Sequence, residues 1–105
     1  MPITKTPLFI GSGDIHPDVE GFTTVVVDDP VTNPKTLVVE GLAADEFLTL
    51  VCDNYAADDW LDVPDGKKTI QFHRNNTSVL LTQHGTYGVS GVVDSTITIY
   101  TRELA

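Results

Sequence analysis

The chain has 105 residues, the length of one domain whose core can form without metals or disulfide bonds. Its 15 acidic and 6 basic residues give a formal net charge of −9, and such a surface repels nucleic-acid phosphates and anionic lipids. The single cysteine, Cys52, excludes an intrachain disulfide, and no apolar run approaches the roughly 20 residues of a membrane-spanning helix.

Residues 1–35 predict an irregular, proline-rich arm that contains one strand. Five of the 6 prolines fall here, and Gly11-Ser12-Gly13 and Asp28-Asp29-Pro30 are further chain breakers. Only Phe22–Val27 has the β-branched and aromatic composition of a strand. We expect this arm either to fray at the terminus or to lie on a neighbouring molecule, and its candidate partner-binding residues are Pro7, Leu8, Phe9 and Ile10.

Residues 36–105 predict a β-sandwich, because short β-branched runs alternate there with turn residues. The expected strands are Thr36–Glu40, Phe47–Cys52, Asp59–Val63, Lys67–His73, Ser78–Gln83, Thr86–Ser90 and Ser95–Thr101. Asn75-Asn76 predicts a tight turn between the fourth and fifth of these strands, since asparagine tolerates positive φ.

Alternation with a period of two predicts which side chains these strands bury. In the last strand, for example, two isoleucines share one face, while Thr96, Thr98 and Tyr100 share the opposite face. The expected structural core consists of Trp60, Tyr87, Cys52, Leu48, Leu50, Ile70, Phe72, Ile97 and Ile99.

The segment Gly85-Thr86-Tyr87 resembles the tyrosine corner of immunoglobulin-like sandwiches. Trp60 and Cys52 lie on strands where such domains place a tryptophan and a cysteine, but Val89 stands where the second cysteine of the disulfide would be. We therefore expect an all-β, immunoglobulin-like antiparallel β-sandwich of about seven strands with an irregular N-terminal arm. Another sandwich or a small barrel is the alternative.

Three sets of polar residues are candidates for metal binding or catalysis, and none has the spacing that such sites need. The acidic residues around the third strand lack a calcium loop, so a solvated rim is favoured over a calcium site; they are Asp53, Asp58, Asp59, Asp62 and Asp65. The histidines match no zinc motif with Cys52; they are His16, His73 and His84. Ser90 lies outside any Gly-x-Ser-x-Gly elbow. We expect no cofactor, no metal and no enzyme activity.

A series of features follows along the chain: the run Leu37–Glu46, the strand Phe47–Cys52, Trp60, Asp65-Gly66, Asn75-Asn76 and Gly85–Val89. In this series, residues 36 to about 91 resemble small β-sandwich virion proteins of tailed bacteriophages, many of which decorate or cement capsids. The resemblance implies a non-enzymatic protein that binds the major capsid protein on the capsid surface and self-associates as a trimer or dimer. It implies no nucleic-acid or membrane partner.

Two other functions remain open from the sequence. One is a tail, fibre or adaptor module that binds other virion proteins or a host glycan, with Trp60, Tyr55 and Tyr100 as sugar-stacking candidates. The other is a small hydrolase or metal-dependent enzyme. The first ten residues lack a basic segment followed by an apolar one, so we expect no signal peptide and synthesis in the host cytoplasm.

Overall fold

The computed structural model describes residues 3–16, 25–27, 35–52, 70–81 and 85–104. Its seven strands are β1 (Ile3–Ile15), β2 (Val25–Val27), β3 (Lys35–Glu40), β4 (Leu48–Cys52), β5 (Ile70–Phe72), β6 (Ser78–Leu81) and β7 (Gly85–Leu104). Every pairing between them is antiparallel. The all-β class is confirmed, and the immunoglobulin-like arrangement stays a prediction. The described residues include no helix with the length and apolarity to span a membrane.

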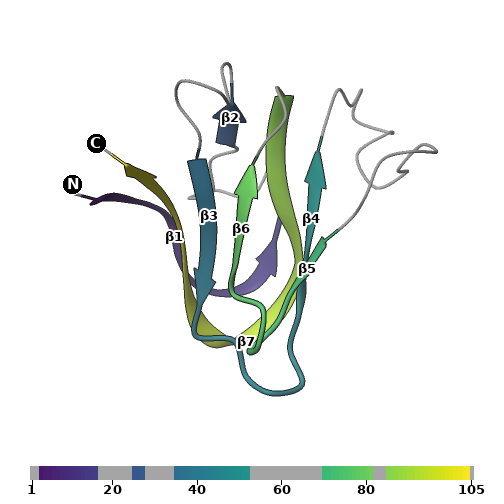
Figure 1. The fold of residues 1–105 in the computed structure, drawn as a ribbon. Helices are drawn as coiled ribbons and strands as arrows, with labels where there is room; N and C mark the ends of the chain where they lie inside the picture. The colour runs from purple at the N-terminus through teal and green to yellow at the C-terminus, as the bar shows by residue number, and fades with distance from the viewer. Residues whose placement is uncertain (1–2, 17–24, 28–34, 53–69, 82–84, 105) are drawn as a thin grey trace.

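The long strand β7 is the centre of the sheet. Its N-terminal part lies between β2 and β4, and its C-terminal part lies between β1 and β3. The sheet continues from β4 to β5 and from β3 to β6. Figure 1 shows β7 bending at the lower end of the molecule, so that the whole sheet curls around the core.

One continuous face explains why β7 is a single strand. The residues that it contributes to the core cluster all occupy odd positions on both sides of the bend; they are Tyr87, Val89, Val93, Ile97 and Ile99. Gly91 lies at the bend with a φ of 146°, and a Cβ there would lie 2.7 Å from Leu48 Cδ2. The prediction of two separate strands, Thr86–Ser90 and Ser95–Thr101, was therefore wrong, because Gly91 bends the strand without ending it.

The prediction of an irregular arm was also wrong for residues 3–15, which form β1. This strand pairs with β7 from Ile3 opposite Leu104 to Ile15 opposite Gly91. Its register shifts between residues 7 and 9 and again between residues 11 and 13, so the proline and the glycines fall at bulges. A strand can hold such residues at irregular positions, where no regular ladder bond is lost. Of the expected strand at residues 22–27, the structure describes only β2.

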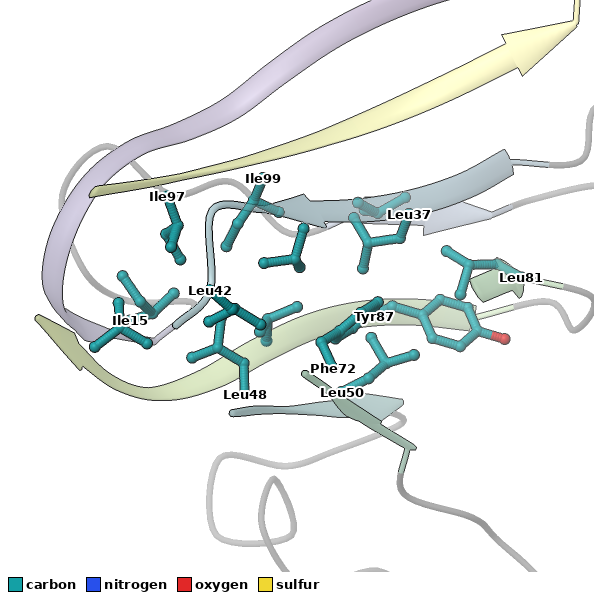
Figure 2. Packing of buried hydrophobic residues seen from close by; sticks show 14 of the residues in the cluster. Ile15, Leu37, Leu42, Leu48, Leu50, Phe72, Leu81, Tyr87, Ile97 and Ile99 are labelled. Carbon is teal, nitrogen blue, oxygen red and sulfur yellow. The ribbon is translucent and has the colours of Figure 1, made fainter. Parts of the chain in front are cut away.

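The core fills the interior of the curled sheet. Figure 2 shows Leu37, Ile97 and Ile99 facing side chains from the opposite wall, among them Leu48 and Phe72. Of the expected core residues, six are buried in this cluster: Leu48, Leu50, Phe72, Tyr87, Ile97 and Ile99. Trp60 lies outside the described residues, as do the side chains of Cys52 and Ile70.

The turn after β5 lies one residue earlier than predicted. His73 and Asn76 pair with each other through N–H···O bonds of 3.1 and 2.8 Å, so Arg74 and Asn75 form the turn. The Asn76 side-chain amide also donates to the Gln71 carbonyl at 2.9 Å. This bond holds Asn76 in the paired position rather than at the tip. The expected strand Asp59–Val63 lies outside the described residues.

Candidate interaction surfaces

A shallow depression opens where β7 bends beside the turn that leads into β4. Its volume is about 270 Å³, and it is lined by Asp45, Glu46, Phe47, Gly91, Val92 and Asp94. A cavity of roughly 150 Å³ accommodates a benzene molecule, so the depression has room for an apolar side chain. Phe47 and Val92 are 53% and 67% exposed. Every charged residue in the lining is acidic, so the depression joins an apolar floor to a negative rim.

The carboxylate of Glu46 holds this depression in shape. Its Oε1 accepts the N–H of Ala43 at 2.9 Å, and its Oε2 accepts the N–H groups of Asp94 at 2.6 Å and Ser95 at 3.1 Å. These bonds, of which the bond from Ala43 has the largest effect, lower the pKa of Glu46 from 4.5 to about 2. Glu46 is therefore ionised at neutral pH and ties the turn before β4 to the bend of β7.

The outer face of the β1–β7–β3 part of the sheet carries a polar cluster around Tyr100. The Tyr100 hydroxyl donates to Glu40 Oε2 at 2.9 Å, and Lys5 Nζ lies 4.5 Å from the ring centroid. Burial, followed by the hydrogen bond to Glu40, raises the pKa of Tyr100 above 10. The ring is only 4% exposed, which leaves little surface for stacking on a sugar. The other sugar-stacking candidates, Trp60 and Tyr55, lie outside the described residues.

A row of residues crosses four strands near the paired ends of β1 and β7. The strand register places Leu80 opposite Thr36, Thr36 opposite Arg102, and Arg102 opposite Lys5. Residues directly opposite each other in a sheet share a face. Leu80 is 54% exposed and the Lys5 side chain is also exposed. This row therefore combines one exposed apolar side chain with two cations.

The candidate partner-binding segment of residues 7–10 divides between the two faces of β1. Leu8 and Phe9 are partly buried and pack against the core. Pro7 and Ile10 are exposed, and Ile10 has the largest exposed fraction of the exposed large apolar residues, at 68%. The part of this segment that faces outward is thus Pro7 and Ile10.

The candidate metal ligands are not brought together within the described part of the chain. No group of three or more histidine, cysteine, aspartate or glutamate side chains converges there. His16 and His73 lie at separate places, after β1 and after β5. His84 and the acidic residues from Asp53 to Asp65 lie outside the described residues. Ser90 is a residue of the continuous strand β7.

Comparison of the chain with protein-family models, curated proteins and solved structures found no match. The function is therefore inferred from the shape, charge and exposed side chains of three surfaces. They are the acidic depression at the bend, the row from Leu80 to Lys5, and the outward side of β1 at Pro7 and Ile10.

Proposed function

We propose that this chain is a non-enzymatic structural protein of a bacteriophage particle that binds the lattice of the major capsid protein as a decoration or cement protein. In this role the curled β-sheet is a rigid frame, and exposed side chains on its outer surface make the contacts. The resemblance of residues 36 to about 91 to small β-sandwich virion proteins also supports this role. The alternative role, in a tail, fibre or adaptor, would use the same frame on another virion protein.

The observation that carries the proposal is the exposure of Ile10 on β1. Ile10 is 68% exposed, and Pro7 on the same segment is also exposed. Leu8 and Phe9 pack against the core and hold this segment in place. An apolar side chain with this much exposed surface gains free energy when a partner protein covers it. Because the segment is held in a ladder with β7, it binds without the cost of ordering a loose arm.

The test is binding to empty shells assembled from the major capsid protein of the same genome. We expect the purified protein to co-sediment with the shells at a fixed ratio of copies to capsid subunits and to raise the shell's melting temperature in calorimetry. A protein that binds the assembled lattice but not its unfolded subunits stabilises the lattice by mass action. Shells that neither take up the protein nor change their melting temperature would refute the proposed function.

A matched pair of variants tests the surface separately from the function. Ile10→Ser removes the exposed side chain on β1, and Val26→Ser removes one that is 47% exposed on β2. We expect Ile10→Ser to weaken shell binding at least tenfold and Val26→Ser to bind as the native protein does. Equal binding of both variants would assign the contact to another surface while the decoration function stands.

A further inference from the structure

The depression at the bend has the properties of a preformed socket. Glu46 fixes the backbone on one side of it through its bonds to Ala43, Asp94 and Ser95. On the other side, the close approach of Gly91 to Leu48 leaves no room for a side chain at position 91. The socket therefore offers a rigid apolar floor with carboxylates at its rim, and it suits a protruding apolar side chain flanked by cations.

The row near the ends of β1 and β7 presents that combination. Leu80 protrudes with 54% of its side chain exposed, and Arg102 and Lys5 lie on the same face across β3 and β7. Arg102 is close enough to act electrostatically on Tyr100, which places its charge on this outer face. The row is therefore the chemical complement of the socket: apolar where the socket is apolar, and positive where its rim is negative.

We propose that the socket and the row bind each other in neighbouring copies of this chain. Leu80 of one copy inserts between Phe47 and Val92 of the next, and the two cations of its row approach Asp45 and Asp94. The two surfaces are different, so the contact is head to tail and each copy uses both surfaces. Such contacts close into a ring when the rotation between copies allows it. The long strand β7 carries residues of both surfaces, with Val92 in the socket and Arg102 in the row.

The net charge of −9 opposes this association at long range but not at contact. At an ionic strength of about 0.15 M, charges more than about 8 Å apart are largely screened. The pairs across the proposed contact are closer than this, and insertion of Leu80 depends little on salt. The association is therefore measured near physiological ionic strength, where the distant acidic groups of two copies no longer repel strongly.

The experiment measures molar mass by light scattering and sedimentation over a dilution series. One variant reverses the socket's charges (Asp45→Lys with Asp94→Lys), and another reverses those of the row (Lys5→Glu with Arg102→Glu). We expect the native chain to form a discrete oligomer and each variant alone to be a monomer. Mixed in equal amounts, the two variants should assemble although neither does alone, because the intact row of one fits the intact socket of the other, and the reversed, now acidic row fits the reversed, now basic socket.

Further variants separate loss of the contact from loss of the fold. Lys5 packs on Tyr100, so Leu80→Ser serves as a second variant of the row that leaves this packing in place. Ile10→Ser is the matched control, because Ile10 is an aliphatic residue that is even more exposed than Leu80, at 68% against 54%, but belongs to neither surface. We expect Leu80→Ser to be a monomer and Ile10→Ser to assemble as the native chain does.

Three results would overturn the proposal. The first is a native chain that stays monomeric throughout the series. The second is a row variant that assembles normally, since this would show that the contact between copies does not use the row. The third is a mixture of folded socket and row variants that forms no oligomer containing both variants. No capsid shell enters the experiment, so its outcome is independent of the proposed decoration function.

Discussion

At the bend of β7, the ladder to β1 is interrupted between the pairs Gly11–Ile97 and Gly13–Val93. The Glu46 carboxylate accepts the N–H groups of Asp94 and Ser95 in this gap. Backbone N–H groups near a protein interior need a partner, and a carboxylate is a strong one. Glu46 thus supplies at the bend the bonds that a neighbouring strand supplies elsewhere.

The first prediction concerns Glu46→Gln and pH. Because folding lowers the pKa of Glu46 from 4.5 to about 2, its ionised form stabilises the fold above pH 4.5, and this contribution is lost as the pH falls towards 2. We expect Glu46→Gln to be less stable than the native chain at neutral pH and to lose less stability over this acid range. Urea unfolding at a series of pH values measures the difference.

Asp45→Asn is the control for this experiment, because Asp45 is an exposed carboxylate in the same turn. We expect Asp45→Asn to be about as stable as the native chain at neutral pH, because Asp45 makes none of the three bonds of Glu46. An acid profile of Glu46→Gln that runs parallel to the native one would show that the carboxylate does not hold the bend.

The second prediction compares two glycines with similar backbone angles. Gly41 has a φ of 102° and Gly13 a φ of 109°, so alanine is strained at either position. That strain costs about 1–2 kcal/mol. A Cβ at Gly41 would also lie 2.6 Å from the Thr96 carbonyl oxygen, whereas a Cβ at Gly13 meets nothing within 4 Å. We expect Gly41→Ala to lower the free energy of unfolding by clearly more than Gly13→Ala, as measured in urea.

Equal losses of unfolding free energy in the two alanine variants would contradict this prediction, because they would show that the close contact of a Cβ at position 41 with Thr96 adds no destabilisation. A near-zero loss for Gly13→Ala would show that β1 adapts its backbone at the bulge.

At the scale of the elements, local patterns predicted most strands, and long-range contacts decided the rest. The strands β3, β4 and β6 lie within one or two residues of their expected positions. β1 was missed because Pro7 and the glycines of Gly11-Ser12-Gly13 are local breakers, and bulges in the ladder with β7 accommodate them. The unity of β7 could have been predicted, since the apolar residues of one face keep odd positions from Tyr87 to Ile99, with only Gly91 and Ser95 between them on that face.

The candidate surfaces were harder to predict for the same reason. Phe47 was expected within a strand, and the structure places it just before β4, in the lining of the depression together with Val92. The residues of β7 that donate to Glu46 are 48 and 49 positions away in the sequence, so no local motif predicts these bonds. The one local signal is the bond to Ala43, three residues earlier. The row from Leu80 to Lys5 could be recognised only from the register of four strands, and composition and periodicity do not give that register.

The third prediction concerns the contact that joins β3 to β7. Tyr100→Phe removes the hydrogen bond to Glu40 and keeps the ring under Lys5. We expect a loss of about 0.5–1.5 kcal/mol at neutral pH. Because folding raises the pKa of Tyr100 above 10, its protonated form stabilises the fold below pH 10, and this contribution is lost as the pH rises through the folded-state pKa. The variant should therefore lose less stability than the native chain above pH 10.

Urea unfolding between neutral and alkaline pH measures both effects. Tyr55 and Tyr87 are present in both proteins, so the difference between the two curves belongs to Tyr100. Identical alkaline slopes would mean that the buried hydroxyl does not couple folding to pH.

At the scale of the whole molecule, one cluster joins both parts of the curled sheet. Ile97 and Ile99 come from the part that holds β1 and β3, whereas Leu48 and Phe72 come from the part that holds β4 and β5. All four are fully buried in the same core. The two parts should therefore fold and unfold together as one cooperative unit.

The fourth prediction tests this cooperativity with a chain that ends at Asp94. The truncation removes the C-terminal part of β7 but leaves the pairing residues of β2, β4 and β5 in place. We expect the shortened chain to show no cooperative unfolding transition in urea and no dispersed amide resonances. A control chain that ends at Glu103 loses only the last paired residue of β7 and should unfold cooperatively. Dispersed resonances from β4 and β5 in the short chain would show that one part folds alone.

The position of β7 in the chain also sets the order of events during synthesis. Within the described residues, β1 and β2 have no strand partner except β7, and β3 and β4 otherwise pair only with β6 and β5. A ribosome therefore releases β1 long before its partner exists, and the nascent chain carries unpaired strands until β7 emerges. The sheet cannot close before β7 is synthesised, and until then the apolar faces of the early strands are exposed to chaperones and to other nascent chains.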